Sequence, residues 1–147
     1  MSSLPRILRG SLTRIVIAAA CIAAVGMSQA QVKQGKTRAL KTGQLMKIVV
    51  KPSCDALKKG LDAAPATPEA WEGLAANAAV LNEVSYLLMD DGRCPDGVWA
   101  EATTKALREG SASLLKAIEA KDVAAAKAAF GATTKSCGGC HEKHKPK

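Results

Sequence analysis

Two cysteines and a histidine lie close together in the sequence near the end of this chain. Cys137, Cys140 and His141 form a Cys-x-x-Cys-His motif. Thiols with this spacing can each form a thioether bond to a haem vinyl group, and the histidine that follows can bind the iron. The motif therefore indicates covalent attachment of one haem c, with His141 as the proximal iron ligand.

Two other chemistries use the same side chains. A redox-active dithiol of the thioredoxin type is expected beside a βαβ unit, and the sequence has no such pattern. A zinc ion could take His144 as a fourth ligand together with Cys137, Cys140 and His141. Four ligands within eight residues of one helix are poorly placed around a tetrahedral ion, so a zinc-stabilised, non-catalytic helical module is a remote alternative.

The N-terminal segment has the pattern of a secretory signal peptide. Three arginines and no acidic residue accompany an apolar run, which ends with Ser28 and Ala30 in front of Gln31. This predicts a signal peptide over residues 1–30, cleaved after Ala30, and export to the periplasm. The run is shorter than the roughly 18 apolar residues that a membrane span requires. Lipoprotein cleavage before Cys21 is a weaker alternative.

The remaining residues, 31–147, have the size of one domain. The whole chain has a formal net charge of +8, and removing the three arginines of residues 1–30 leaves +5. The basic residues are spread out, without an arginine-rich stripe or interleaved aromatics, so no nucleic-acid partner is predicted. A positive surface suits an acidic redox partner protein. The sequence has neither a Ser-His-Asp set nor a phosphate-binding glycine loop, and an enzyme is not predicted.

Apolar residues at helical spacing predict four helices in this domain. The predicted stretches cover residues 32–61, 68–89, 98–118 and a final segment that follows Asp122. Pro52 is expected to kink or break the first stretch, whereas Thr67 and Pro68 provide a favourable start for the second. Short connections between amphipathic helices predict an all-α fold, an antiparallel four-helix bundle.

The apolar face of the last predicted helix leads into the motif. Its positions recur with alternating spacings of three and four residues: Val123, Ala126, Phe130, Thr133, Cys137 and Cys140. This register places both thiols on the core-facing side of the helix and the haem near the C-terminal end of the bundle. His144 is expected on the surface.

Together, these features resemble the class II c-type cytochromes, which comprise cytochrome c′ and its low-spin relatives of the c556 type. The resemblance rests on the four helices, on the C-terminal position of the haem motif, and on Trp99, which shortly follows a loop containing proline and glycine. It covers residues 31–147.

The resemblance assigns roles to individual residues. It implies haem attachment through Cys137 and Cys140 and iron ligation by His141, with Lys143 or Lys145 as a basic residue near the haem edge. It also implies that a homodimer can form, because family members often pair through their first two helices.

The sixth iron ligand divides this family. Cytochrome c′ covers the distal iron face with an apolar side chain and binds small gases there, whereas the c556 relatives supply a methionine from the first helix and transfer electrons. Antiparallel packing is expected to bring Met46, beside Leu45, close to the motif. Met46 is either the distal ligand or a packing residue. Electron transfer is the first hypothesis, and binding of NO or CO is the alternative.

Two further cysteines lie outside the motif and outside the signal segment. Cys54 falls late in the first predicted helix, and Cys94 falls in the loop before the third. A disulfide requires Cα atoms within about 7 Å, and a straight bundle keeps these two positions apart. The two thiols are therefore expected to remain unpaired.

Overall fold

The structure, a computed structural model, describes residues 35–145. Residues 1–34 and 146–147 lie outside the described part of the chain. The predicted signal peptide over residues 1–30 and its cleavage after Ala30 therefore also lie outside it.

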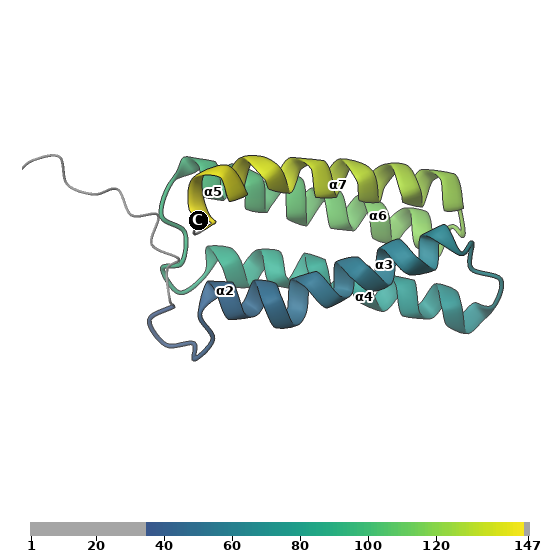
Figure 1. Ribbon diagram of the computed structural model, residues 1–147, viewed down its shortest axis with the longest axis horizontal. Coiled ribbons are helices and arrows are strands. Elements are labelled where there is room, and N and C mark those ends of the chain that lie inside the picture. Colours follow the sequence, from purple (N-terminus) through teal and green to yellow (C-terminus); the bar gives the residue numbers. More distant parts are fainter. Residues whose placement is uncertain (1–34, 146–147) are drawn as a thin grey trace, which may run out of the picture.

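Four antiparallel helical units form the bundle, as the sequence predicts (Figure 1). The first unit comprises α2 (Thr42–Leu45), the π-helical segment η1 (Met46–Val50) and α3 (Lys51–Asp62), and the second is α4 (Pro68–Met89). The third unit comprises α5 (Gly97–Glu101), the π-helical segment η2 (Ala102–Glu109) and α6 (Gly110–Glu119), and the fourth is α7 (Val123–His144). Residues 35–145 contain no β-strand, so the predicted all-α fold is confirmed.

Two helices begin where the sequence predicts, because a side chain caps each of them. The Thr67 hydroxyl accepts a hydrogen bond from the Ala70 amide at 3.2 Å at the start of α4. The Asp122 carboxylate accepts one from the Ala125 amide at 2.9 Å at the start of α7. Each bond satisfies a backbone donor that the first helical turn leaves unpaired.

The first helix is shorter than predicted. It begins at Thr42 instead of near residue 32, and the residues just before it are not helical. The Asp91 carboxylate, in the loop between α4 and α5, accepts hydrogen bonds from the amides of Thr37 and Arg38 at 3.0 and 3.1 Å. These contacts between distant parts of the sequence hold the segment as a loop, and sequence periodicity does not report them.

Pro52 does not break the first helix, which continues through it to Asp62. The π-helical segment η1 ends two residues before the proline, and such a wider turn accommodates one extra residue. Upstream of η1, Thr42 and Leu45 are the buried positions of the first helix, whereas Gly43 between them is exposed.

The core runs along the centre of the bundle and is mainly aliphatic. Its fully buried members include Leu57, Leu81, Leu114 and Ile118, each at most 1 % exposed. Their burial supplies the main stabilisation of the fold. Among the described helices, none is both long enough and apolar enough to cross a membrane.

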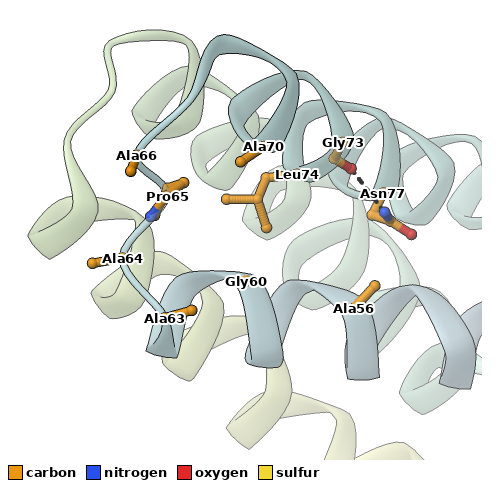
Figure 2. A pocket seen from close by; sticks show the side chains of 10 residues that line it. All are labelled: Ala56, Gly60, Ala63, Ala64, Pro65, Ala66, Ala70, Gly73, Leu74 and Asn77. Carbon is orange, nitrogen blue, oxygen red and sulfur yellow. Dashed lines mark hydrogen bonds between the residues drawn. The ribbon is translucent and has the colours of Figure 1, made fainter.

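A shallow pocket of about 410 Å³ lies where α3 and α4 are joined, at the far end of the bundle from the C-terminus of α7 (Figures 1 and 2). Small apolar residues form most of its lining, and Leu74 reaches across it (Figure 2). The Asn77 amide donates a hydrogen bond to the Gly73 carbonyl at 2.7 Å. None of the lining residues carries a titratable or nucleophilic side chain, so this pocket is not a candidate site.

Candidate haem site

The last turns of α7 present the three residues of the motif. Cys140 and His141 follow Cys137 by three and four positions, and residues with these spacings are neighbours on one side of a helix. Both thiols are half-buried and His141 is exposed. The Cys137 thiol donates to the Thr133 carbonyl at 3.2 Å. Helix α7 therefore brings the predicted haem-binding residues together.

Burial affects the protonation of all three groups. It raises the pKa of the Cys137 and Cys140 thiols above the ordinary value, so both are protonated at neutral pH. Although the His141 side chain is exposed overall, partial desolvation of its imidazole, and secondarily the charge of Lys145, lowers its pKa. The neutral imidazole is the form that ligates a metal, so the environment of His141 favours the form that can bind iron.

An apolar pocket of about 310 Å³ lies beside the motif, between α7 and the third helix. Its lining residues are Gly139 and Cys140 from α7 and Val98, Glu101, Ala102, Lys105 and Ala106 from α5 and η2. Glu101 and Lys105 pair with each other at 3.3 Å and are largely exposed. Cys137 and His141 do not line this pocket. Small apolar side chains beside the Cys140 thiol suit the edge of a macrocycle, so the residues around Cys140 fit one edge of a thioether-linked haem.

Asp96 fixes the end of α7 against the third helix. Its carboxylate accepts a hydrogen bond from the Trp99 amide at 3.0 Å, forms an ion pair with Lys143 at 2.7 Å and lies 3.2 Å from His144 Nε2. The hydrogen bond from Lys143 is the main reason that the pKa of Asp96 falls to about 2. These contacts hold the turn of the helix that directly follows the motif.

The prediction that His144 is an exposed surface residue is wrong. Its side chain is 8 % exposed and packs edge-on against Trp99, with ring centroids 5.4 Å apart. The core positions of α7 alternate with spacings of three and four residues, and the next position after Cys140 in this series is His144. The sequence pattern therefore indicates that His144 is buried. Lys143, expected near the haem edge, is bound to Asp96.

Met46 lies at the junction of α2 and η1. It is half-buried and packs against the same core cluster as Cys140. Its neighbour Leu45 is only 4 % exposed and fills the core position of this turn. Figure 1 places α2, α5 and the C-terminal end of α7 at the same end of the bundle. The predicted distal residue and the haem motif therefore share one end of the fold.

Cys54 and Cys94 are free thiols, as the sequence analysis expects. Burial, and secondarily the proximity of Cys137, raises the pKa of Cys54 to about 11. The Cys94 thiol donates to the Asp96 carbonyl at 3.4 Å. Cys54 thus lies on the side of α3 that faces α7, whereas Cys94 belongs to the loop that anchors the end of α7.

The zinc alternative gains no support from the structure. Within residues 35–145, no group of three or more histidine, cysteine, aspartate or glutamate side chains is arranged to hold a metal ion.

Comparison with known families favours a c-type cytochrome among the remaining classes. The family model described as Cytochrome C' matches residues 95–145. This match supports assignment of the chain to the class II c-type cytochromes. The matched segment contains the third and fourth helices and the whole haem motif, whereas Met46 lies outside it. Searches of curated proteins and of solved structures find no significant match.

The matched family, cytochrome c′, carries a covalently attached haem c. The family consists of haem-binding, non-catalytic carriers that are typically periplasmic, bind small gases and often form dimers. The two half-buried thiols, the neutral imidazole and the apolar pocket beside them are consistent with that group.

Sequence reasoning missed one further residue at this end of the bundle. Arg93 lies in the turn-rich loop between α4 and α5, yet its side chain is only 2 % exposed. An arginine in a polar loop is ordinarily a solvated residue, so no local pattern predicts its burial.

Proposed function

We propose that this cytochrome carries single electrons in the periplasm. In this proposal Cys137 and Cys140 hold the haem through thioether bonds, His141 is the proximal ligand and Met46 is the distal ligand. The haem, when bound, supplies the one-electron couple between ferric and ferrous iron.

The position of Met46 is the observation that favours electron transfer over gas binding. Leu45 already fills the core position at the α2–η1 junction, whereas Met46 is half-buried beside the shared core cluster. Its thioether is therefore not committed to the fully buried core position of this turn. A methionine ligand stabilises ferrous haem and raises the potential, which suits an electron carrier.

Gas binding is the second candidate, and Leu45 is the observation that favours it. Its apolar side chain is buried next to Met46. An apolar residue beside the distal face is the arrangement that the family uses for small gases. In that case Met46 is a packing residue and the iron is five-coordinate.

The proposed location and partners follow from the sequence. Residues 1–30 are proposed to be a signal peptide, and residues 31–147 to be the exported domain. The positive charge of that domain suits an acidic redox partner protein. No catalytic residue is proposed. We also propose that a homodimer can form through the first two helices, as in other members of the family.

Absorption spectra of the oxidised and reduced protein, with and without carbon monoxide, test the proposal. The wild-type protein is expected to be low-spin, to show a sharp alpha band and to resist carbon monoxide. Met46→Leu should become high-spin and take up the gas. The substitution conserves volume and should cost less than about 1.5 kcal/mol of stability.

Met89→Leu is the matched control, because Met89 is also half-buried against the core but lies on α4. It should retain the wild-type spectrum. A wild-type protein that is already high-spin and binds carbon monoxide would replace electron transfer by gas binding. A low-spin spectrum that Met46→Leu leaves unchanged would assign the sixth ligand to another residue.

A further inference from the structure

Arg93 is a buried cation at the end of the bundle that carries the haem motif. It belongs to the loop that joins α4 to α5, and its side chain is 2 % exposed. Its Nη2 donates a hydrogen bond to the Leu40 carbonyl at 2.8 Å. The guanidinium therefore lies between this loop and the segment that leads into α2.

The protein leaves most of this guanidinium without partners. Neither Nε nor Nη1 has a hydrogen-bond partner among the described residues, although both atoms are buried. A guanidinium remains charged at every pH that a protein normally meets. A buried charge is costly unless it is paired and hydrogen-bonded, so Arg93 requires an anionic partner.

The two acidic residues that precede Arg93 in the same loop are engaged elsewhere. The Asp91 carboxylate accepts hydrogen bonds from the Thr37 and Arg38 amides. The Asp90 carboxylate pairs with the Arg38 guanidinium at 2.9 Å. Neither forms a hydrogen bond or an ion pair with Arg93 in the described part of the chain.

The surroundings of Arg93 connect it to the haem end of the bundle. The next residue, Cys94, packs against the same core cluster as Met46 and Cys140. Two residues further on, Asp96 holds Lys143 and His144 at the end of α7. Arg93 thus belongs to a loop that contacts both the segment before the first helix and the end of the helix carrying the haem motif.

We propose that Arg93 is the counter-ion of a haem propionate. This inference rests on the haem that the proposed function requires, because a haem c brings two carboxylates into the protein. Nε and Nη1 of Arg93 are the donors that could bind such a carboxylate. Hydrogen bonds between two charged groups are stronger than those between neutral ones. Arg93 is a positioning residue, since it acts on a carboxylate at the haem periphery and not on the iron.

The reduction potential of the holo-protein, measured from pH 5 to pH 9, tests this role. In the wild-type protein the paired propionate should remain ionised, and the potential should show no step from it. In Arg93→Met the propionate loses its partner. The potential should then fall, because a nearby positive charge that favours ferrous haem is gone, and a pH-dependent step should emerge as the propionate titrates.

Arg38→Met is the matched control. Arg38 is also an arginine beside this loop, but its side chain is 46 % exposed and is paired with Asp90. This variant should keep the wild-type profile, and Arg93→Lys, which retains the charge, should stay near it. Identical profiles for Arg93→Met, Arg38→Met and the wild type would overturn the proposal.

Two measurements on the wild-type protein keep the proposal testable if Arg93→Met does not fold. The propionate-bending band in the resonance Raman spectrum should not shift between pH 5 and pH 9, and a shift would overturn the proposal. A potential that depends specifically on chloride or phosphate, compared at constant ionic strength, would also overturn it, since Arg93 would then hold an anion from solution. Carbon monoxide binding tests the role of Met46 independently. If the electron-transfer proposal fails, the pH profiles of the Arg93 variants therefore still test the propionate proposal.

Discussion

Gly110 marks a close approach of the third and fourth helices, and its replacement by alanine tests how tightly α7 is held. A Cβ atom at Gly110 would lie 2.5 Å from the Thr133 hydroxyl oxygen and 3.3 Å from two Thr133 carbon atoms. Thr133 lies one turn before Cys137, and its hydroxyl donates to the Ala129 carbonyl at 2.8 Å. Thr133 must therefore rotate, or α6 and α7 must separate.

The expected change in the free energy of unfolding of Gly110→Ala combines two opposing effects. Overpacking a well-filled interface costs about 1–3 kcal/mol. Replacing glycine by alanine inside a helix contributes about 1 kcal/mol in the other direction. The net prediction for Gly110→Ala is a loss of about 1 kcal/mol in the free energy of unfolding.

Gly131→Ala is the control, because Gly131 lies on α7 with no neighbouring atom within 4 Å of an added Cβ. This variant should gain about 1 kcal/mol from helix propensity alone. Guanidinium unfolding of the two holo-proteins, followed by far-ultraviolet circular dichroism, should show midpoints displaced in opposite directions from the wild type at equal slopes. If Gly110→Ala stabilised the protein as much as Gly131→Ala does, the close packing of α6 against α7 would be refuted.

Two further substitutions test the core and the anchor of α7. Leu114→Ala removes a side chain that is 0 % exposed and should lower the free energy of unfolding by about 2–5 kcal/mol; Leu40→Ala, at a position 38 % exposed, should cost much less. Asp96→Asn tests the carboxylate whose pKa is lowered to about 2 by the hydrogen bond from Lys143 first and by the Trp99 amide second. A carboxyl group whose folded pKa is depressed stabilises the fold above its unfolded pKa, and this contribution is lost as the pH falls through the folded pKa. Acid titrations of stability should therefore show a smaller loss between about pH 4 and pH 2 in Asp96→Asn than in the wild type, and equal losses would contradict the role of Asp96.

Local signals were sufficient for much of the fold. Thr67 and Asp122 are efficient N-caps, and the polar loop after Met89 ends the second helix, so both ends of α4 and the start of α7 could be predicted. The spacing along α7 correctly identified a partly buried motif, and its continuation would have identified His144.

Tertiary contacts determined the rest. The start of the first helix depends on Asp91, which binds the segment around Thr37 across the bundle end. That helix contains a π-helical segment before Pro52, and upstream of the segment Leu45 and not Met46 fills the core. Neither feature has a counterpart in hydrophobic periodicity, which assumes a regular helix. The burial of Arg93 likewise depends on the packing of the loop against residues near Leu40.

The intact mass of the purified, exported protein tests the central claim most directly, that Cys137 and Cys140 hold a covalent haem. The mass should equal that of the polypeptide from Gln31 to Lys147 plus one haem, and acidic acetone should leave the colour with the protein. Replacing both Cys137 and Cys140 by alanine should abolish the added mass. A wild-type protein that releases its colour into the organic phase, with the mass of the bare polypeptide, would contradict the account.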